Sequence, residues 1–193
     1  MKKTLFLFAG VVVIAAVAYF WMRGSQNQSR FTVPDGFAVE VVAPAEQVGS
    51  VVALTFDSLG RPVISKERGG PTILEDTDGD GIYETEKEFT DKVTGAQGLW
   101  FDGRTLYAVA ADQDKKAGLY KLEDKDGDDK ADSIETLTLF TGPMGEHGPH
   151  HIYRGIDGHP ILILGNHTGI ADEEKRPLSP LDNYSEFRSE ERR

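Results

Sequence analysis

An internal repeat of about 45 residues constrains this chain more than any other feature of its sequence. Ala53-Leu-Thr-Phe-Asp57 resembles Gly98-Leu-Trp-Phe-Asp102, and Ile73-Leu-Glu-Asp-Thr-Asp-Gly-Asp80 resembles Leu122-Glu-Asp-Lys-Asp-Gly-Asp128 about 48 residues later. A third copy begins at His151. A repeat of this length that carries about four strands has the size of one blade of a β-propeller. A β-sandwich would not repeat its sequence at that length.

Short apolar runs follow one another from Phe31 onward, separated by Gly, Pro and Asp. They are rich in β-branched and aromatic residues, which is typical of β-strands. The expected strands are Ala38–Val42, Val51–Phe56, Pro62–Ser65, Thr72–Glu75, Lys87–Thr90, Gly98–Phe101, Thr105–Ala110, Gly118–Leu122, Ser133–Leu139, His151–Arg154 and Ile161–Leu164. The sequence therefore predicts an all-β protein.

The expected architecture is a partial β-propeller of about three to four blades that follows an N-terminal transmembrane helix. Residues 31–170 form this incomplete domain, and residues 171–193 are a charged tail without a strand pattern. Propellers close with about four to eight blades, so the chain is interpreted as a truncated reading frame, a fragment, or half of an assembly.

In residues 1–23, Lys2 and Lys3 precede an uncharged run from Leu5 to Met22. A cleaved signal peptide with Ala16-Val-Ala18 as its small-residue site is one interpretation. An uncleaved signal anchor is favoured, because Tyr19-Phe-Trp21 before Arg23 resembles an interfacial aromatic belt. A buried core helix is a third option.

The cleaved signal peptide and the uncleaved anchor both place the basic N-terminus in the cytoplasm and the rest of the chain outside it. Residues 24–30 are a polar linker between the membrane and the domain. We therefore expect a single-pass protein of the cell membrane whose C-terminal domain is periplasmic or otherwise extracytoplasmic.

Charge and cysteine content exclude several classes of function. The formal net charge is -11, which argues against nucleic acid as a partner, because Lys and Arg must neutralise phosphates there. There are no cysteines, which excludes disulfides, thiolate zinc sites, a catalytic Cys and covalently attached c-type haem.

Two acidic runs have the spacing of calcium-binding loops. The first places Asp76, Asp78, Asp80 and Glu84 at positions 1, 3, 5 and 9, and the second does the same with Asp124, Asp126, Asp128 and Asp132, with Glu135 at position 12. Both depart from the EF-hand, since Lys87 takes position 12 of the first loop and Asp129 replaces the position-6 glycine of the second. We expect calcium in a structural role. The alternative is a pair of solvated turns without an ion.

Four of the five histidines lie in two short segments, Gly145–His151 and Gly165–Thr168. Two strand-like runs could bring their imidazoles to one end of a sheet, where imidazole serves as base, metal ligand or hydrogen-bond donor. The alternative is a polar turn whose histidines only satisfy backbone groups.

Several segments together resemble a family of membrane-bound dehydrogenases. They are Val33–Phe37, Val51–Asp57, Ile73–Gly81, Gly145–His150 and Gly165–Thr168. That family is distantly related to the soluble glucose/sorbosone dehydrogenases, which are six-bladed propellers that use pyrroloquinoline quinone (PQQ). The resemblance covers most of residues 31–170 and implies a six-bladed parent.

The resemblance also implies roles for individual residues. His147 stands ten residues before Asp157-Gly158 and would be the catalytic base, with His150 as the next candidate. Residues expected to bind the cofactor or to orient an imidazole are Arg68, Glu146, Asn166 and His167. Arg68 would meet a quinone carboxylate, because a guanidinium matches carboxylates bidentately.

Three functions stay open. The first is an exported, membrane-anchored, PQQ-dependent sugar or alcohol dehydrogenase-like protein, or a fragment of one, with further propeller blades or an electron acceptor as partners. The second is a non-enzymatic, calcium-stabilised propeller that binds a carbohydrate or a protein. The third is a zinc or copper site of His147, His150 and His167. A deep pocket at His147 would favour the first, and an exposed His147 the second.

Overall fold

The computed structural model describes residues 31–171, which belong to two compact units that divide after Pro44. The described part of the first unit, residues 31–44, contains no helix or strand. The strand expected at Ala38–Val42 is therefore wrong, because its alternating side chains have no partner strand, and Val39 and Val41 are exposed. The signal anchor (1–23), the linker (24–30) and the charged tail from residue 172 lie outside the described residues. Within residues 31–171, no helix is both long enough and apolar enough to cross a membrane.

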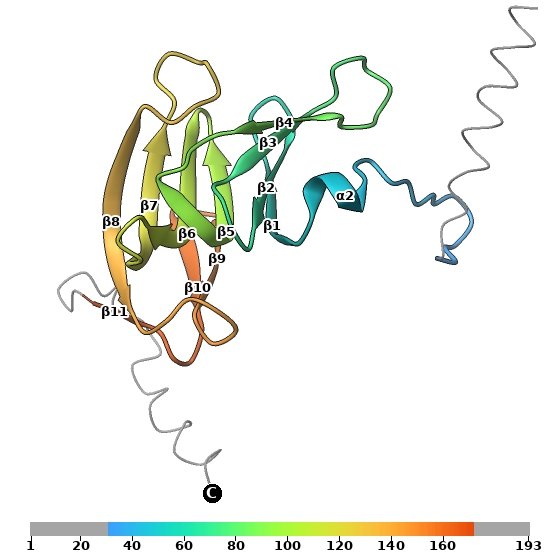
Figure 1. Ribbon diagram of the computed structural model, residues 1–193. Helices are drawn as coiled ribbons and strands as arrows, with labels where there is room; N and C mark the ends of the chain where they lie inside the picture. The colour runs from blue at the N-terminus through green and yellow to red at the C-terminus, as the bar shows by residue number, and fades with distance from the viewer. Residues whose placement is uncertain (1–30, 172–193) are drawn as a thin grey trace, which may run out of the picture. The chain divides into compact units, whose positions relative to one another are not determined.

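The second unit is all-β, as predicted, and is shown in Figure 1. Its elements are α2 (Ala45–Val48), β1 (Val51–Phe56), β2 (Pro62–Lys66), β3 (Thr72–Glu75), β4 (Thr85–Glu88), β5 (Val93–Asp102), β6 (Thr105–Asp112), β7 (Ala117–Glu123), β8 (Ser133–Thr141), β9 (Pro149–Arg154), β10 (Pro160–Leu164) and β11 (Gly169–Ile170). They form three antiparallel sheets. The first sheet is β1-β2-β3-β4, the second is β11-β8-β7-β6-β5, and the third is β10-β9.

Apart from Ala38–Val42, the expected strands are confirmed, with ends that shift by a few residues. The largest shift is in β5, which begins at Val93 because an irregularity between Thr94 and Gly98 lets the strand continue past its glycines. Sequence analysis missed α2 and β11, since elements of four and two residues carry no periodicity.

Two apolar clusters lie on opposite faces of the second sheet. Strand alternation sends Leu99, Leu106 and Leu122 into one cluster with Val63 and Ile73 of the first sheet. It sends Val109 and Leu119 into the other, with Ile152 and Leu162 of the third sheet. The three sheets are therefore packed face to face in chain order, and β5 contacts both β1 and β9.

The three sheets also repeat one another at their first hairpins. Leu54 pairs with Ile64, Leu99 with Ala108, and Ile152 with Leu162. The hairpin turns of the first and third sheets share their hydrogen bonds as well. Asp57 N donates to Arg61 O at 3.0 Å and Gly155 N donates to His159 O at 2.7 Å. The sequence repeat is thus a structural repeat.

Candidate functional site

The first acidic turn joins β3 to β4 and is organised around Asp76. Its Oδ1 accepts backbone N–H groups of Gly79 at 2.7 Å and Asp80 at 3.1 Å, and its Oδ2 accepts that of Gly81 at 2.8 Å. Glu84 Oε2 closes the turn by accepting Thr77 N at 3.0 Å. Gly81 has φ 88°, a left-handed conformation that glycine adopts without strain.

The second acidic turn joins β7 to β8 and repeats most of the hydrogen bonds of the first. Asp124 Oδ1 accepts Gly127 N at 2.6 Å and its Oδ2 accepts Asp129 N at 3.1 Å. Asp132 Oδ2 accepts Lys125 N at 2.7 Å, in the place of Glu84 in the first turn. Both turns therefore curl their carboxylates around one point, as their shared spacing predicts.

The curl brings carboxylates close enough to hold a metal ion such as calcium. In the first turn, oxygens of Asp76, Asp78, Asp80 and Glu84 lie within 4.8 Å of one another, and in the second turn so do those of Asp124, Asp126 and Asp128. Asp132 and Glu135 stand outside the second group. Asp132 instead accepts a hydrogen bond from the backbone N–H of Lys125, and Glu135 forms an ion pair at 3.9 Å with Lys121 on the neighbouring strand.

Charge repulsion is visible in the first group. Desolvation by nearby atoms and then the neighbouring Asp80 carboxylate raise the pKa of Asp78, although its side chain is exposed. The backbone N–H of Thr77 lowers the pKa of Glu84. The first turn therefore keeps several negative charges together, and a bound cation would relieve their repulsion.

Sequence analysis missed an ion network centred on Arg61. Its guanidinium contacts Asp57 at 2.7 Å, Glu75 at 3.0 Å and Asp129 at 2.6 Å, and Lys87 reaches Asp129 at 3.2 Å. The hydrogen bond from Arg61 lowers the pKa of Asp129 to about 2, and the same bond raises the pKa of Arg61. The sequence did contain one signal for this network, since Asp129 replaces the glycine that a calcium loop has at position 6.

A cavity of about 160 Å³ lies beside this network, away from the histidines. It is lined by Arg61, Arg104, Asp124 and Asp129 on its polar side and by Ile73, Phe89 and Phe101 on its apolar side. Arg61 and Asp129 already bind each other, so the cavity wall is held by internal ion pairs.

The second candidate region is the histidine edge, which we define as Glu146, His147, Asn166 and His167. His147 Nδ1 lies 3.0 Å from Asn166 Oδ1, and the rings of His147 and His167 have their centroids 4.7 Å apart. Two backbone bonds hold the segments together, since Gly165 N donates to Gly148 O at 2.7 Å and His167 N to His147 O at 3.1 Å. The two histidine segments thus meet.

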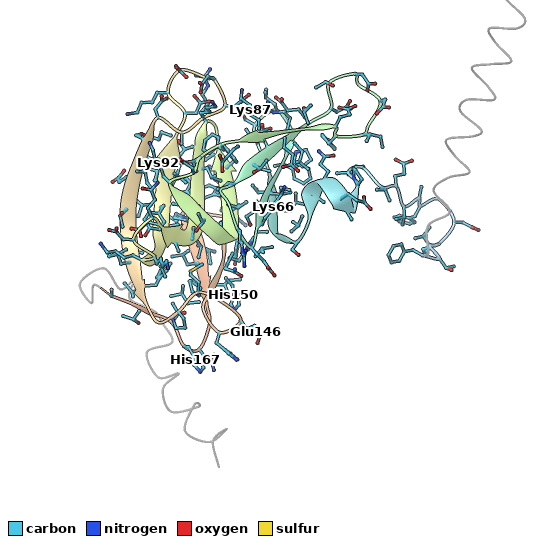
Figure 2. All side chains as sticks on the ribbon, in the orientation of Figure 1. Lys66, Lys87, Lys92, Glu146, His150 and His167 are labelled. Carbon is cyan, nitrogen blue, oxygen red and sulfur yellow. The ribbon has the colours of Figure 1, made fainter. Side chains whose placement is uncertain are left out.

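Figure 2 shows Glu146, His150 and His167 at the lower end of the second unit, with Lys87 at its upper end. His150 is half-buried on β9, whose backbone lies directly against Gly98 of β5. Arg68 is exposed in the turn between β2 and β3, where Gly95 N donates to Gly69 O at 3.4 Å. No contact joins Arg68 to the histidine edge among the interactions of the described residues.

Comparison with known proteins places the chain in a family. Residues 23–190 match the family described as Domain of unknown function (DUF7133). The chain belongs to that family. Searches of curated proteins and of solved structures found no match to this chain. The family description assigns no activity, so function must be argued from the geometry of the sites.

The histidine edge can accept or donate protons, but it does not enclose a ligand. When Nδ1–H of His147 donates to Asn166 Oδ1, Nε2 is left as a proton acceptor. Glu146, His147, Asn166 and His167 are all exposed. Neither carboxylate-rich group of the described residues includes a histidine, so the geometry does not bring a zinc or copper ligand set together.

Proposed function

We propose that this chain is a calcium-binding β-repeat module whose three sheets are consecutive blades of a propeller. The observation that carries the proposal is the convergence of the four carboxylates of the first turn within 4.8 Å. Calcium takes about six to eight oxygen ligands, chiefly carboxylates, backbone carbonyls and waters. The donor set of the first turn fits that preference.

The role of calcium would be structural. Each acidic turn connects the third and fourth strands of a sheet, and each is shaped by backbone N–H groups that bind its first aspartate. A cation would add bonds on the outward side of the same carboxylates. The first turn has four converging carboxylates and the second has three, so we expect tighter binding at the first.

The propeller assignment is supported by the order and packing of the sheets. Sheets of a propeller follow one another in the chain and pack face to face. The second sheet here packs against the first sheet on one face and the third on the other. The expected six-bladed parent, its further blades and its membrane anchor belong to this proposal.

A second candidate function rests on the bond between His147 and Asn166. This contact orients the imidazole so that Nε2 could take the proton of a sugar or alcohol hydroxyl. A dehydrogenase would also need an enclosed site for a quinone, and the described residues do not build one, because the histidine edge is exposed and Arg68 lies in a separate turn. We therefore derive no step through PQQ. The exposure of His147 favours the non-enzymatic binding module.

Calcium titration of the purified full-length chain in mild detergent tests the main proposal. At a calcium concentration of about 100 times Kd, binding to the native state adds about 2.7 kcal/mol of stability, which corresponds to a rise in melting temperature of about 5 to 10 °C. Asp80→Asn should reduce this rise strongly, and Asp128→Asn should reduce it less. Asp114→Asn removes an exposed carboxylate that pairs only with Lys116 at 3.3 Å, so it should leave the rise unchanged.

Absence of binding heat and of any thermal shift at millimolar calcium would refute the calcium proposal. The second candidate is tested separately by dye-coupled oxidation of sugars and alcohols in the presence of PQQ. Activity should disappear in His147→Ala and persist in His159→Ala, which removes an exposed imidazole from the β9–β10 turn. If both variants and the parent are equally inactive, the dehydrogenase candidate is rejected and the binding module stands.

A further inference from the structure

We propose that the cavity beside Arg61 binds one neutral sugar ring. Its lining comes from the β1–β2 and β5–β6 hairpin turns, the second acidic turn and three apolar side chains. All of these residues belong to the second unit, and they come from both the first and the second sheet, so the walls of the cavity are present in this chain. The proposal goes beyond the calcium-binding function and does not require a bound ion.

The carboxylates of the cavity wall are held by the protein itself. Asp57 accepts three hydrogen bonds, one of them from Arg61 Nε at 2.7 Å. Asp129 also accepts three, from Arg61 and Lys87, and Asp124 accepts two from backbone N–H groups. A carboxylate has about four lone-pair sites, so each of them can still accept a hydrogen bond from a ligand. A wall that is already ordered loses little entropy when it binds.

Arg104 supplies hydrogen-bond donors on the exposed side of the cavity. Its guanidinium lies flat against Gly127, where a Cβ would be 2.9 Å from Cζ, Nη1 and Nη2 of Arg104. Within residues 31–171 its one polar contact runs from Nη1 to Lys125 O at 3.5 Å, and no carboxylate forms an ion pair with it. Arg61, by contrast, contacts three carboxylates. The guanidinium of Arg104 is therefore held in place without being neutralised, and its planar fork of N–H donors can bind two oxygens of a ligand.

The apolar side of the cavity is formed by Ile73, Phe89 and Phe101. Ile73 and Phe89 are buried and Phe101 is half-buried, so Phe101 offers the accessible apolar area. Its ring is fixed by an edge contact with Phe89, with the ring centroids 5.3 Å apart. A sugar ring has hydroxyls around its edge and C–H groups on its faces, and polarised C–H groups are attracted to an aromatic ring. The cavity thus matches a sugar in having one polar and one apolar side.

The charges around the cavity favour a neutral ligand. Three positive groups stand beside four negative ones, and they are Arg61, Lys87 and Arg104 against Asp57, Glu75, Asp124 and Asp129. An anion would be repelled by this negative excess and by the net charge of -11 on the chain. A cation would meet the guanidinium of Arg104. Hydroxyl groups both donate and accept hydrogen bonds, so a neutral sugar can use the carboxylates and Arg104 together.

The size of the cavity limits the ligand to one ring. Its volume is about 160 Å³, whereas cavities that hold drug-sized ligands begin at about 300 Å³. A single hexose suits this scale, and a longer saccharide would extend into solvent past Ser58 and Leu59, which are exposed. The small contact area and the few hydrogen bonds imply weak binding, with a Kd of about 1 mM or higher.

Saturation-transfer nuclear magnetic resonance tests the proposal on the full-length chain, in chelator and in a detergent without a sugar headgroup. The probes are D-glucose, D-galactose and D-mannose, with acetate as a small anion. We expect magnetisation transfer to at least one hexose at millimolar concentration and none to acetate. Arg104→Ala should weaken the binding about tenfold or more, because it removes hydrogen bonds from a charged group. Arg104→Lys should weaken it too, since lysine keeps the charge but loses the planar fork.

Arg68→Ala removes an exposed guanidinium outside the cavity and is the matched control, which should bind as the parent does. Arg104 forms no ion pair within residues 31–171, so its variants should keep the melting temperature and circular dichroism of the parent. Absence of transfer to all three hexoses would overturn the proposal. So would equal binding by the parent and either Arg104 variant, or transfer to acetate, which would indicate an anion site. Because calcium is chelated, these outcomes are independent of the calcium proposal.

Discussion

Arg61 and Asp129 form a two-pronged ion pair between residues 68 positions apart, with Nη2 2.6 Å from Oδ1 and Nη1 3.1 Å from Oδ2. Arg61 belongs to the β1–β2 hairpin of the first sheet, and Asp129 to the acidic turn after β7 of the second. Asp129 has φ 65° and occupies the place that Gly81, with φ 88°, holds in the first turn. The second turn therefore uses this position to attach itself to the neighbouring sheet.

Arg61→Ala should destabilise the protein by about 2 kcal/mol, between the usual effects of surface and buried ion pairs. The variant leaves the Asp57 side chain, which is 5% exposed, with backbone donors alone. Urea unfolding at neutral pH measures the change. Lys116→Ala removes a pair whose side chains are 58% and 75% exposed and should have little effect. Equal effects of the two variants would contradict a structural role for the network.

The same pair should make stability fall at acid pH. Arg61 lowers the pKa of Asp129 from 3.8 to about 2, so the ionised carboxylate is favoured in the folded state. Its contribution is fully present above about pH 4 and is lost as pH falls towards 2. Because the pair is partly solvated, we expect the contribution to be on the order of 1 kcal/mol. Asp129→Asn should flatten that part of the pH profile, and an unchanged profile would reject this origin.

Asp78→Asn should stabilise the calcium-free protein while removing the part of its response to calcium that comes from the first turn. Desolvation and the Asp80 carboxylate raise the pKa of Asp78, so its ionised form opposes folding at pH values above that pKa. Asn keeps the Oδ1 that accepts Asp80 N at 3.2 Å. In chelator we expect a small rise in the melting temperature. A lower melting temperature in chelator would show that the charge is already compensated.

Gly165→Ala should disrupt the histidine edge. A Cβ at this position would lie 2.3 Å from His147 O and 2.4 Å from Gly148 O, and backbone atoms cannot rotate away. We expect the free energy of unfolding to fall by about 2 to 3 kcal/mol. The contact between His147 and Asn166 should also weaken, which nuclear magnetic resonance of the His147 ring would detect. Gly169→Ala meets only the Thr141 hydroxyl at 3.0 Å, which can move, and should cost less. Similar losses would mean that the two segments are not closely held.

Local patterns predicted much of the second unit. Runs such as Val51–Phe56 and Thr72–Glu75 gave the strands found, since their period and their flanking turn residues are local properties. The equal spacing of Asp76 and Asp124 from their glycines predicted two matching turns. By contrast, Ala38–Val42 has strand-like alternation without a strand, because alternation indicates a possible face but does not provide a partner.

The sequence by itself determined the all-β class, the repeat and the acidic turns, because each follows from contacts between near neighbours. The tertiary structure decided which of the repeated sheets and turns contact one another. It placed Asp129 on Arg61 rather than in the carboxylate group, brought His147 to Asn166, and left Leu54 uncovered where Leu99 and Ile152 are buried. These relationships depend on how whole sheets stack, and residues far apart in the chain carry no local pattern that records that stacking.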